Sequence, residues 1–337
     1  MTHVRIAVSC LVGATIAACG HGMERSERIG LVLSGGGAKG AYEVGVWQEM
    51  QAVGLASRVT AISGTSIGAL NAALFATKPG AAEKIWLENI EDVFTLNTNR
   101  VAKSIQRTVD DVSRAVDVAE ETGDDWKGAA TLLLSTLVRV ADAYAKETNS
   151  GEIRTGYIDS SRLAAALDEV LPREWPKAIP SVYATAVEKG GRGVSATWRL
   201  NDEKHERRVL MLRASAAIPF GFDTVLIDGK PYVDGGWESE GGDNVPLKPI
   251  IDNHPDIKTV IVVYLKDEEN LGAFRRTRNR YVASAAGIRL VEIIPSEDIS
   301  GTFGFGGVFD TSPETARRLI SLGRKDARKV LARNGLD

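Results

Sequence analysis

The chain has 337 residues, of which 44% are hydrophobic and 25% are charged, so neither a long disordered protein nor a collagen-like fibre fits its composition. Its 41 Lys and Arg against 44 Asp and Glu give a formal net charge of −3, which leaves no overall positive field to hold nucleic acid. The longest apolar run, residues 6–18, is shorter than the roughly 20 residues that a membrane-spanning helix requires.

The N-terminal residues have the pattern of an export signal. Arg5 precedes the apolar run 6–18, which ends in small residues before Cys19, as in a secretory signal peptide. The last four of these residues, Ile-Ala-Ala-Cys, also resemble the bacterial lipobox, in which the cysteine receives a lipid. We expect a signal peptide over 1–18, lipidation of Cys19, a tether over 19–28, and an exported protein anchored by lipid to a bacterial membrane. An ordinary signal peptide or a buried first strand is the alternative.

Two strand–turn–helix units follow the tether. Residues 29–33 form an apolar run that ends in Ser-Gly-Gly-Gly, and residues 41–53 carry apolar side chains on one helical face. The same order recurs at once, with a strand over 59–62, a glycine-containing turn, and a helix of small residues over 69–76. Successive β-α units predict a parallel sheet with helices packed on it.

The rest of the chain divides into a helical segment and a second group of strands. Residues 81–150 show no strand pattern, which predicts a helical insertion; a lid that faces a membrane is a weaker hypothesis for it. Beyond the insertion the sequence predicts a hairpin over 182–200, a helix over 208–217, a turn at 228–230 between short strands, and strands over 259–265 and 290–294. It also predicts a C-terminal helix over 313–333, whose seven Lys and Arg are expected to face solvent; contact with anionic lipid is the less favoured alternative. We expect a single α/β domain over 29–337 that contains this insertion.

Ser66 lies in the pattern G-x-S-x-G, with Gly64 and Gly68 on either side, between a predicted strand and a predicted helix. This context is typical of a nucleophile elbow, a sharp turn that exposes a serine hydroxyl at the end of a strand. The glycines avoid clashes that a Cβ would create, and the following helix N-terminus favours developing negative charge. A tight β-α turn with a capping serine would produce the same pattern.

A glycine-rich loop, GGGAKG, occupies residues 35–40 and also matches the G-x-G-x-x-G of dinucleotide sites. No acidic residue follows the next strand to bind a ribose, and Lys39 is not followed by the Ser or Thr of a Walker phosphate loop. Successive amides in a loop without side chains can instead bind an oxyanion. We expect Gly36 and Gly37 to be these donors.

A nucleophilic serine needs a base, and no histidine of the sequence is a persuasive one. His254 stands between Asn253 and Pro255, as in a surface turn, although a Ser-His-Asp esterase that uses it remains an alternative. Asp234 follows a strand-like pair and precedes two glycines, which would leave its carboxylate open to a neighbouring group. An aspartate that only folds a turn would also fit this pattern.

Four stretches, in this order, resemble the patatin-like phospholipase family: the loop at 35–40, the elbow at 64–69 with Asn71-Ala72 behind it, residues 214–219, and Asp234-Gly235-Gly236. The resemblance extends over about residues 29–265. It implies a three-layer α/β/α sandwich around a mainly parallel sheet, and hydrolysis of acyl esters of lipids by a Ser-Asp dyad without metal or cofactor. Ser66 would be the nucleophile and Asp234 the base, and the glycine loop would bind the oxyanion, with Lys39 where the family has Lys or Arg.

The sequence departs from the family after the aspartate. The family usually reaches Asn-x-Pro soon after Asp-Gly-Gly, whereas here residues 237–243 precede Asn244-Val245-Pro246, which would reshape the rim of the cleft. An aspartate of ordinary pKa, about 3.9, is a weak base for a hydroxyl, so we expect modest turnover that depends on the oxyanion loop. A lipid-binding lipoprotein without catalytic activity, in which the glycine loop holds a headgroup, is the alternative from another class.

Overall fold

The computed structural model describes residues 27–88, 160–191, 193, 195–219, 222–237, 241–267, 273–299 and 311–337. The predicted signal peptide, Cys19 and most of the tether lie outside the described residues, as does most of the predicted insertion, so these stay predictions. Within the described ranges, no helix combines the length and the apolar character needed to cross a membrane.

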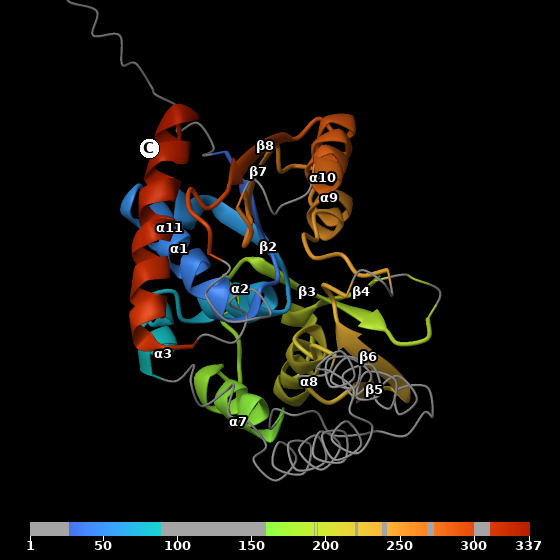
Figure 1. Ribbon diagram of the computed structural model, residues 1–337. Coiled ribbons are helices and arrows are strands. Elements are labelled where there is room, and N and C mark those ends of the chain that lie inside the picture. Colours follow the sequence, from blue (N-terminus) through green and yellow to red (C-terminus); the bar gives the residue numbers. More distant parts are fainter. Residues whose placement is uncertain are drawn as a thin grey trace, which may run out of the picture.

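An eight-stranded sheet forms the centre of the fold (Figure 1). Its strands are β1 (Ile29–Leu33), β2 (Val59–Thr65), β3 (Ser181–Glu188), β4 (Ser195–Arg199), β5 (Val225–Ile227), β6 (Lys230–Asp234), β7 (Thr259–Val263) and β8 (Arg289–Ile293). Their spatial order is β5-β6-β3-β2-β1-β7-β8, and β4 also pairs with β3. Strands β3, β2, β1, β7 and β8 are parallel to one another. Strands β4 and β6 each pair with β3 in the antiparallel direction, and β5 pairs with β6 in the same way.

Helices cover both faces of the parallel strands. They are α1 (Ala41–Ala52), α2 (Ile67–Thr77), α3 (Ala82–Glu88), α7 (Ser160–Val170), α8 (His205–Ser215), α9 (Lys248–Asn253), α10 (Ala273–Ala285) and α11 (Pro313–Arg333). Leu31 and Leu33 of β1 pack in one core with side chains of α1, α2 and α11, and Val32 packs in a second core with side chains of α9 and α10. Figure 1 shows these two groups of helices on opposite sides of the sheet. The predicted three-layer α/β/α sandwich is therefore confirmed.

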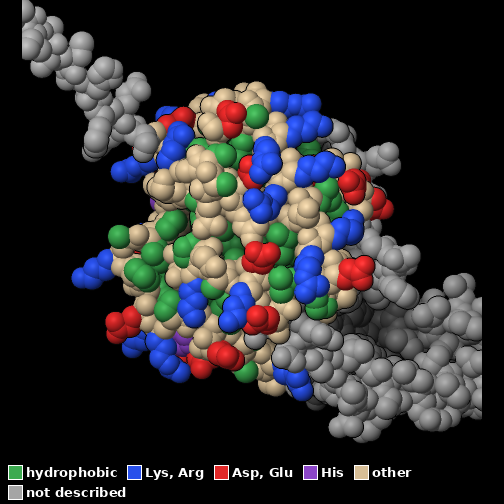
Figure 2. Space-filling model, turned by 90° about the vertical axis from the view of Figure 1, so that its left-hand side faces the viewer, with side chains coloured by type: hydrophobic (Ala, Val, Ile, Leu, Met, Phe, Trp, Pro, Cys, Tyr) green, Lys and Arg blue, Asp and Glu red, His purple; other side chains and the backbone are tan. Residues whose placement is uncertain are grey.

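The C-terminal helix has the predicted bounds, and its seven Lys and Arg side chains are all exposed. Arg328 donates from Nε to Oε1 of Glu49 on α1, at 2.8 Å. On the face of the molecule to which α11 belongs, Figure 2 shows basic and acidic side chains interspersed. The cations of α11 thus form part of a mixed, solvated surface, as the sequence predicts.

Two boundaries near the glycine-containing turn are wrong in the sequence prediction. The strand expected over 59–62 continues to Thr65, because Ser63 and Gly64 still pair with β1 and β3. The helix expected from residue 69 begins at Ile67. The turn between strand and helix therefore consists of Ser66 alone.

Helices α1 and α11 cross at very short range because each presents a glycine to the other. A Cβ at Gly45 would lie 2.0 Å from the carbonyl oxygen of Ile320, and a Cβ at Gly323 would lie 2.1 Å from that of Tyr42. Both obstacles are backbone atoms, which cannot rotate away. Any larger residue at either position must push the two helices apart.

Gly45→Ala is accordingly expected to lower the free energy of unfolding by about 1–3 kcal/mol, the usual cost of overpacking a core. Urea unfolding followed by circular dichroism measures the change. Gly80→Ala is the matched control, because a Cβ at Gly80 would meet no atom within 4 Å. Equal midpoints for the two variants would contradict the close crossing.

Candidate active site

The glycine loop and Ser66 both lie at the carboxyl edge of the parallel strands. Strand β1 stands between β2 and β7, so the chain leaves β1 toward one neighbour and returns much later on its other side. In open α/β sheets such a change of direction leaves a crevice outside the carboxyl ends of the strands, where ligands bind. The glycine loop follows β1 and Ser66 follows β2.

Ser66 is buried, with 4% of its surface exposed, and has a left-handed backbone with φ of 55°. Among the described residues only Asp228, in the β5–β6 turn, shares a positive φ without being glycine. Such a conformation is costly for a side chain and persists where the surroundings hold it, often at a functional site. Here the Ser66 amide donates to Oγ of Ser215 at 2.9 Å.

The two glycines of the elbow pattern are needed for close approach. A Cβ at Gly64 would lie 2.3 Å from backbone atoms of Gly68, and one at Gly68 would lie 2.5 Å from the carbonyl oxygen of Leu33. Both distances are far below van der Waals contact. The glycines therefore let α2 turn back directly against β1 and β2, as the nucleophile-elbow interpretation expects.

The register of the sheet places Asp234 beside the elbow. Thr65, the residue before Ser66, pairs with Thr185 of β3, and the next residue of β3, Ala186, pairs with Asp234 at the end of β6. Two strand spacings separate the backbones of Ser66 and Asp234 by roughly 10 Å, which two inclined side chains can bridge. The structure thus brings together two residues that the sequence places far apart.

The carboxyl group of Asp234 is buried, and burial raises its pKa to about 6. Hydrogen bonding from the Ser66 side chain and from the Gly236 amide opposes this rise, the amide donating to Oδ1 at 2.7 Å. The sequence expectation of an ordinary pKa near 3.9 is therefore wrong, because burial of a residue depends on tertiary packing. A carboxylate with a higher pKa is a stronger base for a hydroxyl.

The contact between the two side chains is close without being an aligned hydrogen bond. The Ser66 hydroxyl lies near enough to lower the pKa of Asp234, yet no donor among the described residues reaches Oδ2 with ordinary hydrogen-bond geometry. Such a geometry is common in catalytic pairs, whose hydrogen bonds often have long donor–acceptor distances until substrate binds.

Ser215 connects Ser66 to the residue after Asp234, and the sequence analysis assigned it no role. Its Oγ accepts from the Ser66 amide and donates to the carbonyl of Thr185 at 2.6 Å. Its carbonyl accepts from the amide of Gly235, at 3.2 Å. Ser215 belongs to the 214–219 stretch that the sequence analysis noted, and that stretch was the available signal.

The glycine loop is held by Asn244, which lies beyond the additional residues 237–243. Asn244 Nδ2 donates to the carbonyl of Gly35, and the Gly35 amide donates to the carbonyl of Asn244, each at 3.2 Å. Gly37 has a positive φ of 59° and lines a small cavity together with Ser66. Within the described chain, the amides of Gly36 and Gly37 make no backbone hydrogen bond, so both can donate elsewhere.

Lys39 is buried at the end of this loop. Burial, together with repulsion from Lys266, lowers its pKa to about 8, although Asp298 and Asp267 act in the opposite direction. These charged neighbours follow β7 and β8 rather than the elbow. A contribution of Lys39 to oxyanion binding stays a prediction.

A buried polar network behind the loop was not anticipated. Asn71 of α2 donates from Nδ2 to the carbonyl of Gly40 at 3.0 Å and to Oε2 of Glu43 at 2.8 Å. Trp86 of α3 donates from Nε1 to Oδ1 of Asn71 at 2.9 Å. Burial raises the pKa of Glu43 well above its usual range. The network fixes the end of the glycine loop to the helix that follows Ser66.

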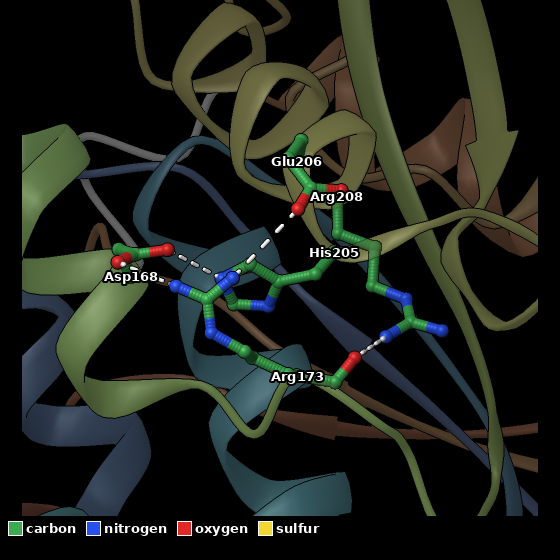
Figure 3. Close-up of polar contacts among 5 residues, drawn as sticks. All are labelled: Asp168, Arg173, His205, Glu206 and Arg208. Carbon is green, nitrogen blue, oxygen red and sulfur yellow. Dashed lines mark hydrogen bonds and ion pairs between the residues drawn. The ribbon is translucent and has the colours of Figure 1, made fainter.

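The two described histidines have partners outside this centre. His254 Nε2 lies 3.0 Å from the hydroxyl of Tyr183. His205 Nε2 lies 2.7 Å from Oδ1 of Asp168, so that it joins α8 to α7 (Figure 3). These contacts do not favour a Ser-His-Asp esterase built on His254. The described residues also contain no group of three or more His, Cys, Asp or Glu side chains that could hold a metal ion.

The protein is an α/β protein of the type that carries a nucleophile elbow. Its mainly parallel sheet is covered by helices on both faces and has a strained serine at its carboxyl edge. The family model described as Patatin-like phospholipase matches residues 31–255, more than half of the chain. The chain belongs to this family, and membership supports lipid acyl hydrolase activity in general.

Several solved structures contain similar chains. VipD from Legionella pneumophila has 16% sequence identity and a TM-score of 0.46, and human GIVD cytosolic phospholipase A2, in complex with methyl gamma-linolenyl fluorophosphonate, has 11% and 0.42. ExoU from the type III secretion system of Pseudomonas aeruginosa, in complex with SpcU, has 16% and 0.40. The match with VipD covers 91% of this chain and 67% of VipD. The match with the human phospholipase covers 92% of this chain and 60% of that chain, and the match with ExoU covers 91% and 52%, respectively. No match was found among curated protein sequences.

Proposed function

We propose that the protein is a serine acyl hydrolase that cleaves acyl esters of lipids, either phospholipids or lysophospholipids, with Ser66 as nucleophile and Asp234 as base. The observation that carries the proposal is the contact of the Ser66 side chain with the buried Asp234 carboxyl, whose pKa is raised to about 6. Family membership supports the reaction class. The export signal and the lipid on Cys19 are separate proposals from the sequence, and the chemistry does not depend on them.

In the proposed mechanism, Ser66 Oγ attacks the acyl carbonyl while the Asp234 carboxylate takes the hydroxyl proton. The amides of Gly36 and Gly37 stabilise the oxyanion of the tetrahedral intermediate. Asp234 then returns the proton to the leaving alcohol, and an acyl-enzyme remains on Ser66. A water molecule, deprotonated by Asp234, attacks this ester and releases the fatty acid, which regenerates both residues.

Covalent labelling by an alkyl fluorophosphonate tests the proposal directly. The probe phosphonylates an activated serine with loss of fluoride, so we expect one adduct, which peptide mass spectrometry locates at Ser66. A protein that binds lipid vesicles but does not react would instead favour the lipid-binding alternative.

The pH dependence tests the role of Asp234. A base must be ionised, so kcat/KM should be low below the pKa of Asp234 and should rise as the pH passes through about 6. Initial rates on p-nitrophenyl butyrate, in buffers of constant ionic strength, measure the profile. An inflection near the ordinary aspartate pKa of about 4 would mean that a different, less buried carboxylate limits the rate.

A further inference from the structure

The small cavity at Ser66 adjoins a larger one between α2 and α7. Gly37, Ser66 and Ala216 line the first, and Ile67, Leu70 and Leu163 line both. In the larger cavity, the space open to the centre of a water-sized sphere is about 60 Å³, several times what one water molecule requires on this measure. The two cavities are therefore neighbours, and the larger one begins close to the nucleophile.

The walls of the larger cavity offer almost nothing to a polar ligand. Among the described residues that line it, Asn71 is the one polar residue, and its side chain is already hydrogen bonded to Gly40, Glu43 and Trp86. The other lining residues are apolar. An occupant that gains from burial here is a hydrocarbon chain, because a polar group would lose its hydrogen bonds with water.

The helices also limit the length of such a chain. The lining residues extend along α2 from Ile67 to Leu74 and along α7 from Leu163 to Val170. At 1.5 Å per helical residue each wall is roughly 10 Å long, and an extended chain advances about 1.2 Å per bond. The two helical walls are thus about as long as an extended chain of eight to ten carbons.

We propose that this cavity binds the acyl chain of the ester, with the scissile carbonyl at Ser66 and the hydrocarbon between α2 and α7, and that it selects medium-length acyl groups. The inference rests on the proposed function, since it assigns the cavity to the acyl group that Ser66 would carry.

Polar contacts hold the α7 wall in place (Figure 3). Asp168 of α7 accepts from buried His205 of α8, and Arg173, just beyond α7, lies 3.4 Å from Asp168 and 3.7 Å from Glu206. Arg208 of α8 donates to the carbonyl of Arg173, at 3.2 Å. A wall fastened in this way gives its side chains a defined distance from Ser66.

A matched pair of substitutions on α7 tests the inference. Ala166 lines the cavity, whereas Ala165, the next residue, is exposed. Ala166→Trp should lower kcat/KM for p-nitrophenyl octanoate relative to acetate by about tenfold or more, because the indole occupies the path of the longer chain. Ala165→Trp should keep the wild-type ratio. The ratio within one preparation corrects for any loss of folded protein.

Val170→Trp extends the test to the deep end of the cavity. Val170 lies one helical turn beyond Ala166, about 6 Å further from Ser66 along α7. Compared with Ala166→Trp, the Val170→Trp variant should therefore accept acyl chains about five carbons longer before activity falls. The series acetate, butyrate, octanoate, laurate and palmitate locates both limits. This second variant also carries the test if Ala166→Trp does not fold.

The possible results are distinct. A wild-type maximum near octanoate, with a shorter limit in Ala166→Trp than in Val170→Trp, supports the acyl cavity. Equal losses on all esters, or a wild-type maximum at palmitate, overturn it while leaving the hydrolase intact. A wild-type protein that cleaves none of the esters and takes no fluorophosphonate label contradicts the proposed function itself.

Discussion

Replacing Ser66 with alanine is expected to lower kcat/KM for every ester by roughly 10³-fold or more, since no acyl-enzyme can form without the nucleophile. Folding should survive, because the residue 66 amide can still donate to Ser215 Oγ and the side chain becomes smaller. Hydrolysis of p-nitrophenyl butyrate and the fluorophosphonate adduct report the loss independently. If the variant still hydrolyses the ester and still forms the adduct, the nucleophile is a different residue.

Ser63→Ala is the matched control for this substitution. Ser63 is fully buried on β2, three residues before the elbow, and its Oγ has no hydrogen-bond partner among the described residues. Its removal should therefore leave kcat/KM within about twofold of the wild type, as for a side chain outside the chemistry. Loss of activity in both variants would indicate that the strand, and not the Ser66 hydroxyl, is responsible.

Asp234→Asn is expected to reduce kcat by about 10²–10⁴-fold, the usual contribution of a positioned base. Asparagine keeps an oxygen that can accept from the Gly236 amide but cannot take the proton of Ser66. The same substitution should make the protein more stable at about pH 8. The pKa of Asp234 is about 6 in the folded protein, above the ordinary value of 3.8. The contribution of this carboxyl group to stability is therefore fully present below pH 3.8 and is lost as the pH rises through 6.

The free energy of unfolding at pH 8 should rise by up to about 3 kcal/mol in the Asp234→Asn variant, because the buried negative charge is removed. Urea unfolding at about pH 4 and about pH 8 measures this, and the gain should shrink at the lower pH. Asp243→Asn is the control for loss of a buried carboxylate outside the proposed dyad. Burial also raises the pKa of Asp243, and its Oδ1 accepts from the Val245 amide. An Asp234→Asn variant that is inactive and also less stable at both pH values would indicate a structural role for this aspartate.

Elements with strong local patterns were predictable. The strand at 29–33 is a continuous apolar run, and the helix at 313–333 ends at an Asn-Gly pair, so both have the expected bounds. Helices α7, α9 and α10 were not predicted. Helix α9 has only six residues, and α10 has basic residues through its centre, which obscure an apolar face.

The candidate site divides in the same way. Ser66 has a local pattern around it, whereas Asp234 was paired with it through the family resemblance. The roles of Ser215 and Asn244 depend on hydrogen bonds between segments far apart in the chain, and the pKa of Asp234 depends on what covers it. Neither these long-range hydrogen bonds nor the raised pKa of Asp234 produces a local sequence pattern, so a single sequence could not predict them.

The crossing of α1 and α11 connects the beginning and the end of the fold. The face of the first long helix that carries Gly45 is covered by the last helix, whose Gly323 meets it at backbone contact. A ribosome synthesises these two segments almost 280 residues apart. The nascent chain must therefore leave an apolar surface of its first β-α unit without its partner helix until α11 has been synthesised, and a chaperone that holds this surface during that interval would hinder misassembly.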